Sequence, residues 1–262
     1  MAADPFDISG RVVWVTGSSR GVGRGVVEHL AAHGATVIVH ARRPEAVEEV
    51  LAGLGPAAFA MTADVRDEAA VAEAVASIDA RFGRLDGVVA NVGGALPGPA
   101  DTVGVERFRK QLDLNLTGAF ATATAAHPLL RASRGAVVLI SATAAGGPTP
   151  QFAAYGAAKA ATEHLTGSLA AEWGPEVRVN CVSPGLIRTE GSLKSVFRGS
   201  EELAARAGRT TAVGRIGEPA DIAKACHYLL SDAAAFVSGA VIVVDGGPTD
   251  GPTQRILRAL ET

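Results

Sequence analysis

A tyrosine and a lysine four residues apart are the residues of this sequence with the most informative chemistry. Tyr155 and Lys159 lie in a stretch that is flanked by strong helix formers. Side chains at i and i+4 lie on one face of a helix, so the phenol and the ammonium can point into one site. A free phenol has a pKa near ~10, and a fixed cation beside it favours the phenolate. Such a tyrosine can exchange a proton with an alcohol oxygen.

The same spacing also occurs on exposed helix surfaces, so the elements around the pair decide its meaning. Apolar runs alternate with helical patterns along most of the chain. Strands are predicted at 11–16, 35–40, 57–63, 85–91, 136–141, 177–182 and 241–245, and helices at 22–33, 44–51, 67–82, 105–130, 152–173 and 219–230. Apolar strands that alternate with helices indicate a parallel sheet covered on both faces. The chain is therefore predicted to be a single α/β domain of the doubly wound, Rossmann type, with residues 191–213 as a small inserted substrate lobe.

Composition excludes several other classes of protein. The chain has 262 residues and a net charge of −3, with both signs mixed, so we expect no nucleic-acid surface. We expect no membrane association, since no apolar run approaches the ~20 residues of a membrane span. The acidic N-terminus lacks the regions of a signal peptide, which favours a cytoplasmic protein. Cys181 and Cys226 lie in apolar surroundings, and no histidine or cysteine cluster has metal spacing. We predict no metal.

A glycine-rich turn follows the first predicted strand, in the stretch from Thr16 to Gly23. Its spacing is G-x-x-x-G-x-G rather than the common G-x-G-x-x-G. Glycines at a strand-to-helix junction allow a tight turn and the close approach of a pyrophosphate to the helix N-terminus. The turn therefore predicts a nucleotide site.

Together, these motifs resemble those of the classical short-chain dehydrogenase/reductase family, from Gly10 to Gly247. The motifs that carry the resemblance are the glycine turn, Asn91-Val92-Gly93, Asn115, the Tyr155–Lys159 pair, Ser183-Pro184-Gly185 and Asp245-Gly246-Gly247. The resemblance implies an NAD(P)-dependent oxidoreductase that acts on a small-molecule carbonyl or alcohol, and a homotetramer. Within that family, the chain resembles the bacterial 3-oxoacyl thioester and ketone reductases.

The end of the second predicted strand bears on the choice of cofactor. Position 41, where relatives that use NAD have an aspartate, is Ala41, and Arg42 and Arg43 follow. Guanidinium groups suit the 2′-phosphate of NADP(H), whereas a solvated helix start is the alternative interpretation of these arginines. Positive charge is otherwise unfavourable at a helix N-terminus, so we predict NADP(H). The resemblance implies that the cofactor is bound by Gly17, Ser19, Arg20, Gly21, Val22, Gly23, Arg42, Arg43, Asp64, Val65, Asn91, Gly93, Tyr155, Lys159, Pro184, Gly185, Ile187 and Thr189.

The resemblance also assigns catalytic roles and exposes one departure from the family pattern. It implies that Tyr155 is the acid/base, that Lys159 lowers the pKa of Tyr155, and that Asn115 holds a relay water. The family's carbonyl-binding serine is expected thirteen residues before the tyrosine, where this chain has Ala142. A bulge can turn Ser141 into the site, Thr143 or a loop N–H can replace the serine, or the donor is absent. Ser141 and Ala142 are the predicted substrate-binding positions.

Other functions remain open. A non-catalytic NADP(H)-binding regulator is one, and a reductase of an activated C=C or C=N bond is another, since such substrates rely less on a carbonyl-binding serine. We expect substrate specificity to come from residues 93–99 and from the lobe, whose apolar residues suggest an amphipathic lid. Residues 248–262 are expected to dock on a neighbouring subunit.

Overall fold

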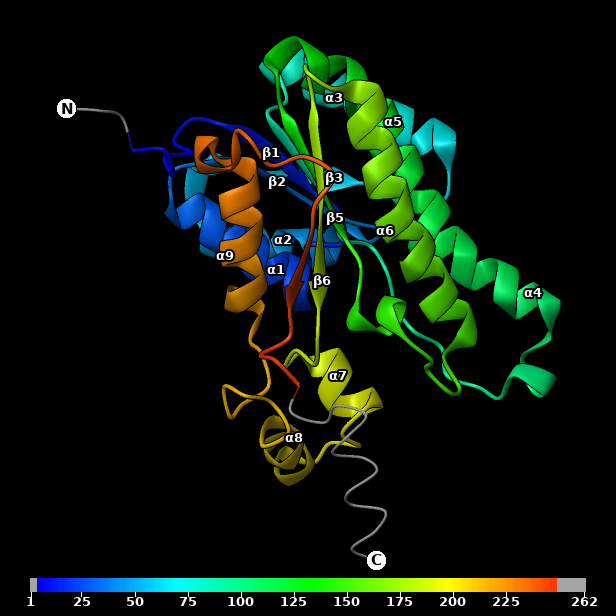
Figure 1. The fold of residues 1–262 in the computed structure, drawn as a ribbon. Coiled ribbons are helices and arrows are strands. Elements are labelled where there is room, and N and C mark those ends of the chain that lie inside the picture. The colour runs from blue at the N-terminus through cyan, green and yellow to red at the C-terminus, as the bar shows by residue number, and fades with distance from the viewer. Residues whose placement is uncertain (1–3, 249–262) are drawn as a thin grey trace, which may run out of the picture.

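The computed structural model describes residues 4–248, which form a seven-stranded parallel sheet with helices on both faces (Figure 1). The strand order is β3-β2-β1-β4-β5-β6-β7, which confirms the doubly wound prediction. The strands are β1 (Val12–Val15), β2 (Thr36–Ala41), β3 (Ala58–Thr62), β4 (Gly87–Ala90), β5 (Ala136–Ile140), β6 (Arg178–Pro184) and β7 (Val241–Val244). Strand β1 pairs with both β2 and β4, as Val13 lies opposite Val37 and Gly87. The strand order reverses there, where doubly wound sheets bind ligands.

Two layers of helices bury the two faces of the sheet (Figure 1). Helices α1 (Gly21–Ala32), α2 (Pro44–Leu54) and α9 (Pro219–Leu230) cover one face, and α3 (Glu68–Phe82), α5 (Gly118–Ser133) and α6 (Ala153–Trp173) cover the other. Successive residues of a strand point to opposite faces. Accordingly, Val13 of β1 packs in the first layer and Trp14 in the second.

The predicted helix 105–130 is interrupted in the structure. It consists of α4 (Ala100–Leu112), a π-helical segment over Asp113–Thr117, and α5. Within α4, Gly104 has a positive φ of 70°, which marks a kink. Single-turn π segments commonly occur at functional sites, and Asn115 lies in this one, fully buried.

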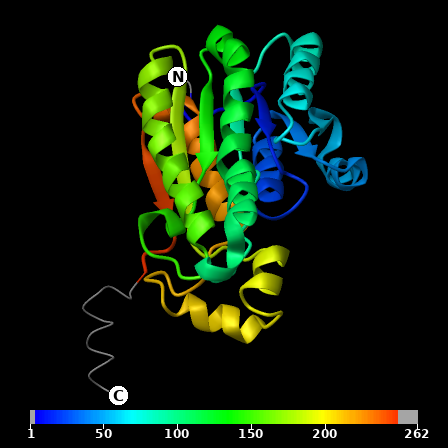
Figure 2. The ribbon, with the colours of Figure 1, turned by 90° about the vertical axis from the view of Figure 1, so that its right-hand side faces the viewer.

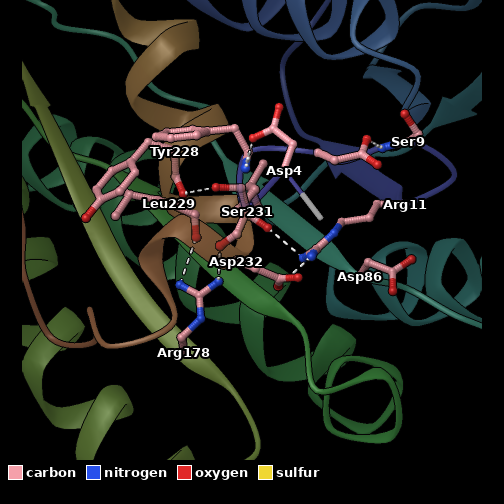
Figure 3. Close-up of polar contacts among 12 residues, drawn as sticks. Asp4, Ser9, Arg11, Asp86, Arg178, Tyr228, Leu229, Ser231 and Asp232 are labelled. Carbon is pink, nitrogen blue, oxygen red and sulfur yellow. Dashed lines mark hydrogen bonds and ion pairs between the residues drawn. The ribbon is translucent and has the colours of Figure 1, made fainter. Parts of the chain in front are cut away.

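The C-terminal end of α9 is tied to the amino ends of two strands (Figure 3). Arg178, at the start of β6, donates to the carbonyl oxygens of Leu229 and Ser231 at 2.8 and 3.2 Å. Arg11, just before β1, donates to the carbonyl oxygen of Leu230 at 2.8 Å. Cations stabilise the negative end of a helix dipole, so the arginines hold α9 against the sheet at the end opposite the glycine turn.

The segment between β6 and α9 forms a small helical lobe beyond the carboxyl ends of the strands (Figures 1 and 2). It contains α7 (Glu190–Ser195) and α8 (Glu201–Gly208). The lobe has a small hydrophobic cluster of its own, formed by Phe197, Ala204 and Ile216. Some apolar residues of the predicted lid are therefore buried inside the lobe. In the described part of the chain, no helix is long and apolar enough to cross a membrane. Apart from residue 248, the predicted docking tail lies outside the described residues.

Candidate active site

The glycine turn packs directly onto the end of β4. Gly17 and Gly21 have positive φ angles of 64° and 57°, which favour glycine. A Cβ on Gly23 would lie 2.5 Å from the side-chain nitrogen of Asn91 and from the carbonyl oxygen of Gly17. The Asn91 amide donates to the carbonyl oxygens of Thr16 and Gly17 at 3.0 and 3.1 Å. Asn91 therefore braces the turn from below, with no room for a larger residue at Gly23.

The N-terminus of α1 suits a bound phosphate. Its first turn contains no acidic residue, and its N-cap residue, Arg20, makes no side-chain capping bond. The first N–H groups of a helix have no partner within the helix and form its positive end. The half-buried Ser19 and Val22 flank the exposed Arg20 in this turn. Free N–H donors without a competing carboxylate fit the pyrophosphate of a dinucleotide.

Three arginines are placed where a 2′-phosphate would be expected, at the ends of β1 and β2. Arg20, Arg42 and Arg43 are all exposed, and Arg42 lies 4.0 Å from a carboxylate oxygen of Asp64. Asp64 is held mainly by Arg66, whose hydrogen bonds lower the pKa of that carboxyl to about 2. Among residues 4–248, no carboxylate pairs with Arg20 or Arg43. These two cations remain available to a ligand.

The remaining predicted cofactor residues also lie along the carboxyl edge of the sheet. Thr189 caps α7 and is placed 3.5 Å from a Cβ built on Gly21. Ile187 pairs with Gly217 through its backbone. Pro184 is the last residue of β6. The next residue, Gly185, packs against Asp245, whose Cβ would lie 2.6 Å from a Cβ built on the glycine. Val65 packs against Gly118, and its side chain lies 2.7 Å from a Cβ built there. The structure thus brings the predicted motifs from β1, β4, β6 and β7 to one edge.

Asn115 and Lys159 meet at Gly93, and Tyr155 lies next to Lys159. The Lys159 ammonium lies 5.7 Å from the centre of the Tyr155 ring. A Cβ on Gly93 would lie 2.8 Å from the Asn115 side-chain oxygen and 3.2 Å from the Lys159 nitrogen. Because both groups press on this position, only glycine fits there. In the described part of the chain, the Tyr155 hydroxyl has no hydrogen-bond partner, so it is free to meet a substrate oxygen.

Asn115 and Lys159 are both fixed by backbone groups. The Asn115 side-chain oxygen accepts from the Gly94 N–H at 2.9 Å, and its NH₂ group donates to the carbonyl oxygens of Gly94 and Gln111, each at 3.0 Å. The Lys159 ammonium donates to the carbonyl oxygen of Ile140 at 2.8 Å. An ammonium has three donors, so two of those on Lys159 remain for other partners.

Burial, rather than the neighbouring lysine, governs the pKa of Tyr155. Desolvation raises the pKa of Tyr155 to about 12 and lowers that of Lys159 to about 8. In the chain alone, burial thus outweighs any lowering of the Tyr155 pKa by Lys159, and that role of Lys159 stays a prediction. The ammonium is separated from the phenol and bonded to a carbonyl, so its charge does not offset the cost of burying a phenolate. The chain holds Tyr155 in its proton-donating form.

Ser141 does not turn into the site. Its hydroxyl lies 3.1 Å from the carbonyl oxygen of Lys159 and 2.9 Å from a carboxylate oxygen of Glu163, which also accepts from Ser183 at 2.9 Å. Both contacts account for the Ser141 hydroxyl, so among the three alternatives they favour the two in which Ser141 does not serve the site. The sequence analysis did not single out Glu163, although it lies four residues after Lys159 and hence on the same helix face.

Ala142 thus stands at the family's serine position without a hydroxyl. Its backbone is extended and it precedes the short 3₁₀ turn Thr143–Gly146. Thr143 is exposed on that turn. Nearby, a groove of about 270 Å³ lies between the loop after β4, α4 and the start of α6. Leu96, Gln111 and Ala154 are among its lining residues, but Tyr155 is not, so the groove lies beside the reaction site.

His40 braces the glycine turn from β2 and makes folding sensitive to pH. It is fully buried and accepts from the Gly17 N–H at 3.2 Å, and burial lowers its pKa to about 4. The unfolded chain binds this proton near pH 6.5. Stability from His40 is therefore complete above pH 6.5 and is lost as the pH falls to about 4, by about 3 kcal/mol. We expect this loss in denaturant unfolding curves.

The control is His40→Asn, which keeps an acceptor near the imidazole Nδ1 position but does not titrate. The wild-type protein and His40→Asn are to be unfolded with denaturant at the same protein concentration, at several pH values from 7.5 to 4. The free energy of unfolding of the variant is expected to fall less over this range. Parallel pH profiles would show that His40 does not contribute to the acid sensitivity.

The fold and the site together define a class of protein. Nicotinamide-dependent oxidoreductases combine three features that this chain has. These are a doubly wound sheet, a glycine turn at the N-terminus of the first helix, and a Tyr–Lys–Asn group at the carboxyl edge of the sheet. The family model described as enoyl-(acyl carrier protein) reductase matches residues 17–249. The chain belongs to the short-chain dehydrogenase/reductase family, whose members act on alcohols and carbonyls.

Individual relatives cover nearly the whole fold. The chain is 36% identical over 249 residues to a 2,5-dichloro-2,5-cyclohexadiene-1,4-diol dehydrogenase of Sphingobium indicum, covering 93% of this chain and 98% of that one. It is 40% identical over 220 residues to an inactive 2-(S)-hydroxypropyl-CoM dehydrogenase of Xanthobacter autotrophicus, covering 82% and 96%. The crystal structure of a gluconate 5-dehydrogenase from Burkholderia cenocepacia in complex with NADP and tartrate is similar with a TM-score of 0.86 and 29% identity, covering 93% and 96%.

Proposed function

We propose that this protein is an NADP(H)-dependent reductase of a small carbonyl compound, with Tyr155 as the proton donor. The observation that carries the proposal is the hydroxyl of the half-buried Tyr155, which has no hydrogen-bond partner within residues 4–248, on a ring whose centre lies 5.7 Å from the Lys159 ammonium. Burial raises the pKa of Tyr155 to about 12, so the phenol retains its proton at neutral pH. That state suits protonation of an oxygen that gains negative charge.

The roles of the chain's residues follow from their contacts. The nicotinamide would supply the hydride to the carbonyl carbon. Tyr155 gives its proton to the carbonyl oxygen, and the Lys159 ammonium, held by Ile140, stabilises the resulting phenolate. Asn115, in the π-helical segment, fixes the loop at Gly94 through two hydrogen bonds and so sets the position of this loop beside Lys159. The α1 N-terminus and Arg42 hold the phosphates.

The experiment that tests the proposed function is NADPH oxidation by the purified protein with activated ketones, β-ketoesters, imines and enones. Turnover on ketones or β-ketoesters is the expected result. Turnover confined to enones or imines would contradict carbonyl reduction, and NADPH binding without turnover on any compound would favour a regulatory binder.

The cofactor preference gives a sharper prediction. Arg42→Ala is expected to raise the KM for NADPH about 10- to 100-fold, because it removes a charge-assisted hydrogen bond to the 2′-phosphate. The KM for NADH should change little, since NADH lacks this phosphate. The wild-type protein is expected to prefer NADPH, in line with the solved relative that holds NADP. Steady-state kinetics with both cofactors measure these values.

A matched control separates the local charge from the net charge. Arg131→Ala removes one exposed arginine from α5, at the other face of the sheet, and should leave both KM values unchanged. If Arg42→Ala raises the KM for NADPH and NADH equally, Arg42 supports the fold of the site rather than recognising the 2′-phosphate. Equal or better efficiency of the wild-type protein with NADH would refute the NADP(H) assignment.

A second candidate function is reduction of an activated C=C bond. Ala142 favours it, because such a substrate does not need a hydroxyl donor at the carbonyl oxygen in the same way. The description of the matching family as an enoyl reductase is in line with it. The enone arm of the substrate panel separates the two functions.

A further inference from the structure

Three of the six histidines gather at one place, far along α1 from the glycine turn. His29 and His33 come from the last part of α1, and His227 comes from the last turn of α9. One ring nitrogen from each lies within 4.8 Å of the other two. His29 is eight residues from the start of α1, or about 12 Å along the helix. The cluster is therefore separate from the candidate active site.

Helix geometry and close helix packing build this cluster. His29 and His33 are at i and i+4, so their rings lie over one face of α1. Helix α9 packs on that helix so tightly that a Cβ on Gly25 would lie 2.5 Å from the Pro219 side chain. His227 is buried between the helices, His29 is half-buried and His33 is exposed. The three rings therefore lie together between the helices, with His33 on the solvent side.

Backbone carbonyls orient two of the three rings. His227 Nε2 lies 2.7 Å from the carbonyl oxygen of Phe6, and His33 Nδ1 lies 2.7 Å from that of His29. A carbonyl only accepts, so each of these nitrogens carries the proton. The lone pairs are then on His227 Nδ1 and His33 Nε2. This is how metal-bound histidines are commonly held: one nitrogen donates to a carbonyl and the other binds the ion.

We propose that His29, His33 and His227 bind a divalent transition metal, zinc(II) in particular, which links α1 to α9. Neutral imidazoles are good ligands for zinc. With bonds of about 2.0–2.1 Å, two nitrogens on a tetrahedral ion are about 3.3 Å apart. His29 Nε2 and His227 Nδ1 are already 3.1 Å apart, and the exposed His33 is free to move the remaining distance. Water completes the coordination.

Two features of the surroundings bear on this site. A neutral hydrogen bond between His29 and His227 would explain that pair but not the convergence of His33. Burial, then the other two histidines and last the exposed Lys224 lower the pKa of His29 to about 4. Lys224 opposes a bound cation, although solvent screens an exposed ammonium. The site is thus predicted to bind more tightly when Lys224 is neutralised.

The ion is expected to stabilise the fold rather than to join the reaction. A ligand that binds only the folded state adds stability by mass action. At a hundredfold excess over its Kd, zinc should raise the Tm by about 5–10 °C for a chain of this size. The link would hold α1, which begins at the glycine turn, against α9.

The test uses the full chain without a histidine tag, after treatment with a chelator. Zinc is titrated in competition with a chromophoric chelator, and thermal unfolding is followed with and without zinc. We expect one equivalent to bind and the Tm to rise. His33→Ala, at an exposed position that folding does not need, should weaken binding at least about 10-fold and remove most of the Tm shift.

Two further variants sharpen the test. His164→Ala removes an exposed histidine on α6 and should leave zinc binding unchanged, whereas Lys224→Gln should tighten it. Cobalt(II) provides a second readout, since a four-coordinate ion absorbs visible light much more strongly than an aquated one. Absence of binding, or equal binding by wild-type protein and His33→Ala, would overturn the proposal.

Discussion

Tyr155→Phe is expected to lower kcat by a factor of about 10²–10⁴, which is the contribution of a positioned general acid. The substitution removes only the hydroxyl, which makes no hydrogen bond to any of residues 4–248. The fold therefore loses no contact, and the Tm should stay the same or rise slightly, because burying the phenol hydroxyl costs free energy. The loss should appear in kcat while the Kd for NADPH changes little.

Tyr228→Phe is the matched control, because the chain has two tyrosines. Tyr228 is at the far end of α9, beside Phe6, away from the carboxyl edge of the sheet. Its loss should leave kcat unchanged. Substrate turnover, NADPH fluorescence titration and thermal unfolding are to be measured on all three proteins. Retained turnover by Tyr155→Phe would rule out the tyrosine as the acid, and a lost NADPH affinity would point to a structural role.

Much of this architecture could be predicted from the sequence, because its signals are local. Apolar strands alternating with helices are sufficient to predict the parallel sheet. The glycine turn is readable because only glycine tolerates the positive φ at Gly17 and Gly21. Tyr155 and Lys159 lie one turn apart on α6, and Asn115 lies in the π-helical segment before α5, so the sequence motifs alone indicate which residues belong to the site. These features depend on residues close in sequence or on the topology of parallel sheets.

What could not be predicted depends on energies that no short pattern encodes. The residues around Asn115 favour a helix, and the π segment adds one residue to a turn without changing that preference. The raised pKa of Tyr155 reflects burial, which requires the packed structure. Two of the three clustered histidines, His29 and His33, are an i and i+4 pair in the sequence, but a pair alone did not indicate a metal site. The third ligand, His227, comes from a helix almost two hundred residues later.

The position of Ala142 leads to the second large effect. Ala142→Ser is expected to raise kcat/KM for ketones by about 10²–10³, the value of one donor to a developing oxyanion. Ala142 has an extended backbone after β5, and neighbouring side chains along an extended chain point in opposite directions. Ser141 is bonded to Lys159 and Glu163, so a hydroxyl at 142 would lie on the opposite side of the chain from that network. A Cβ is already present at Ala142, so one oxygen is the only addition.

Ser141→Ala is the control that separates the two hydroxyls. It removes hydrogen bonds to the Lys159 carbonyl and to Glu163, so we expect a lower Tm and a smaller change in kcat than Ala142→Ser causes. A gain in rate for ketones, without a gain for enones, would show that the natural chain reduces carbonyls with one donor missing. An unchanged rate would mean that a group already present, such as the exposed Thr143 hydroxyl, serves the oxygen. A loss of rate would mean that the natural substrate uses the space that Ala142 leaves, and its own polar group would then replace the serine.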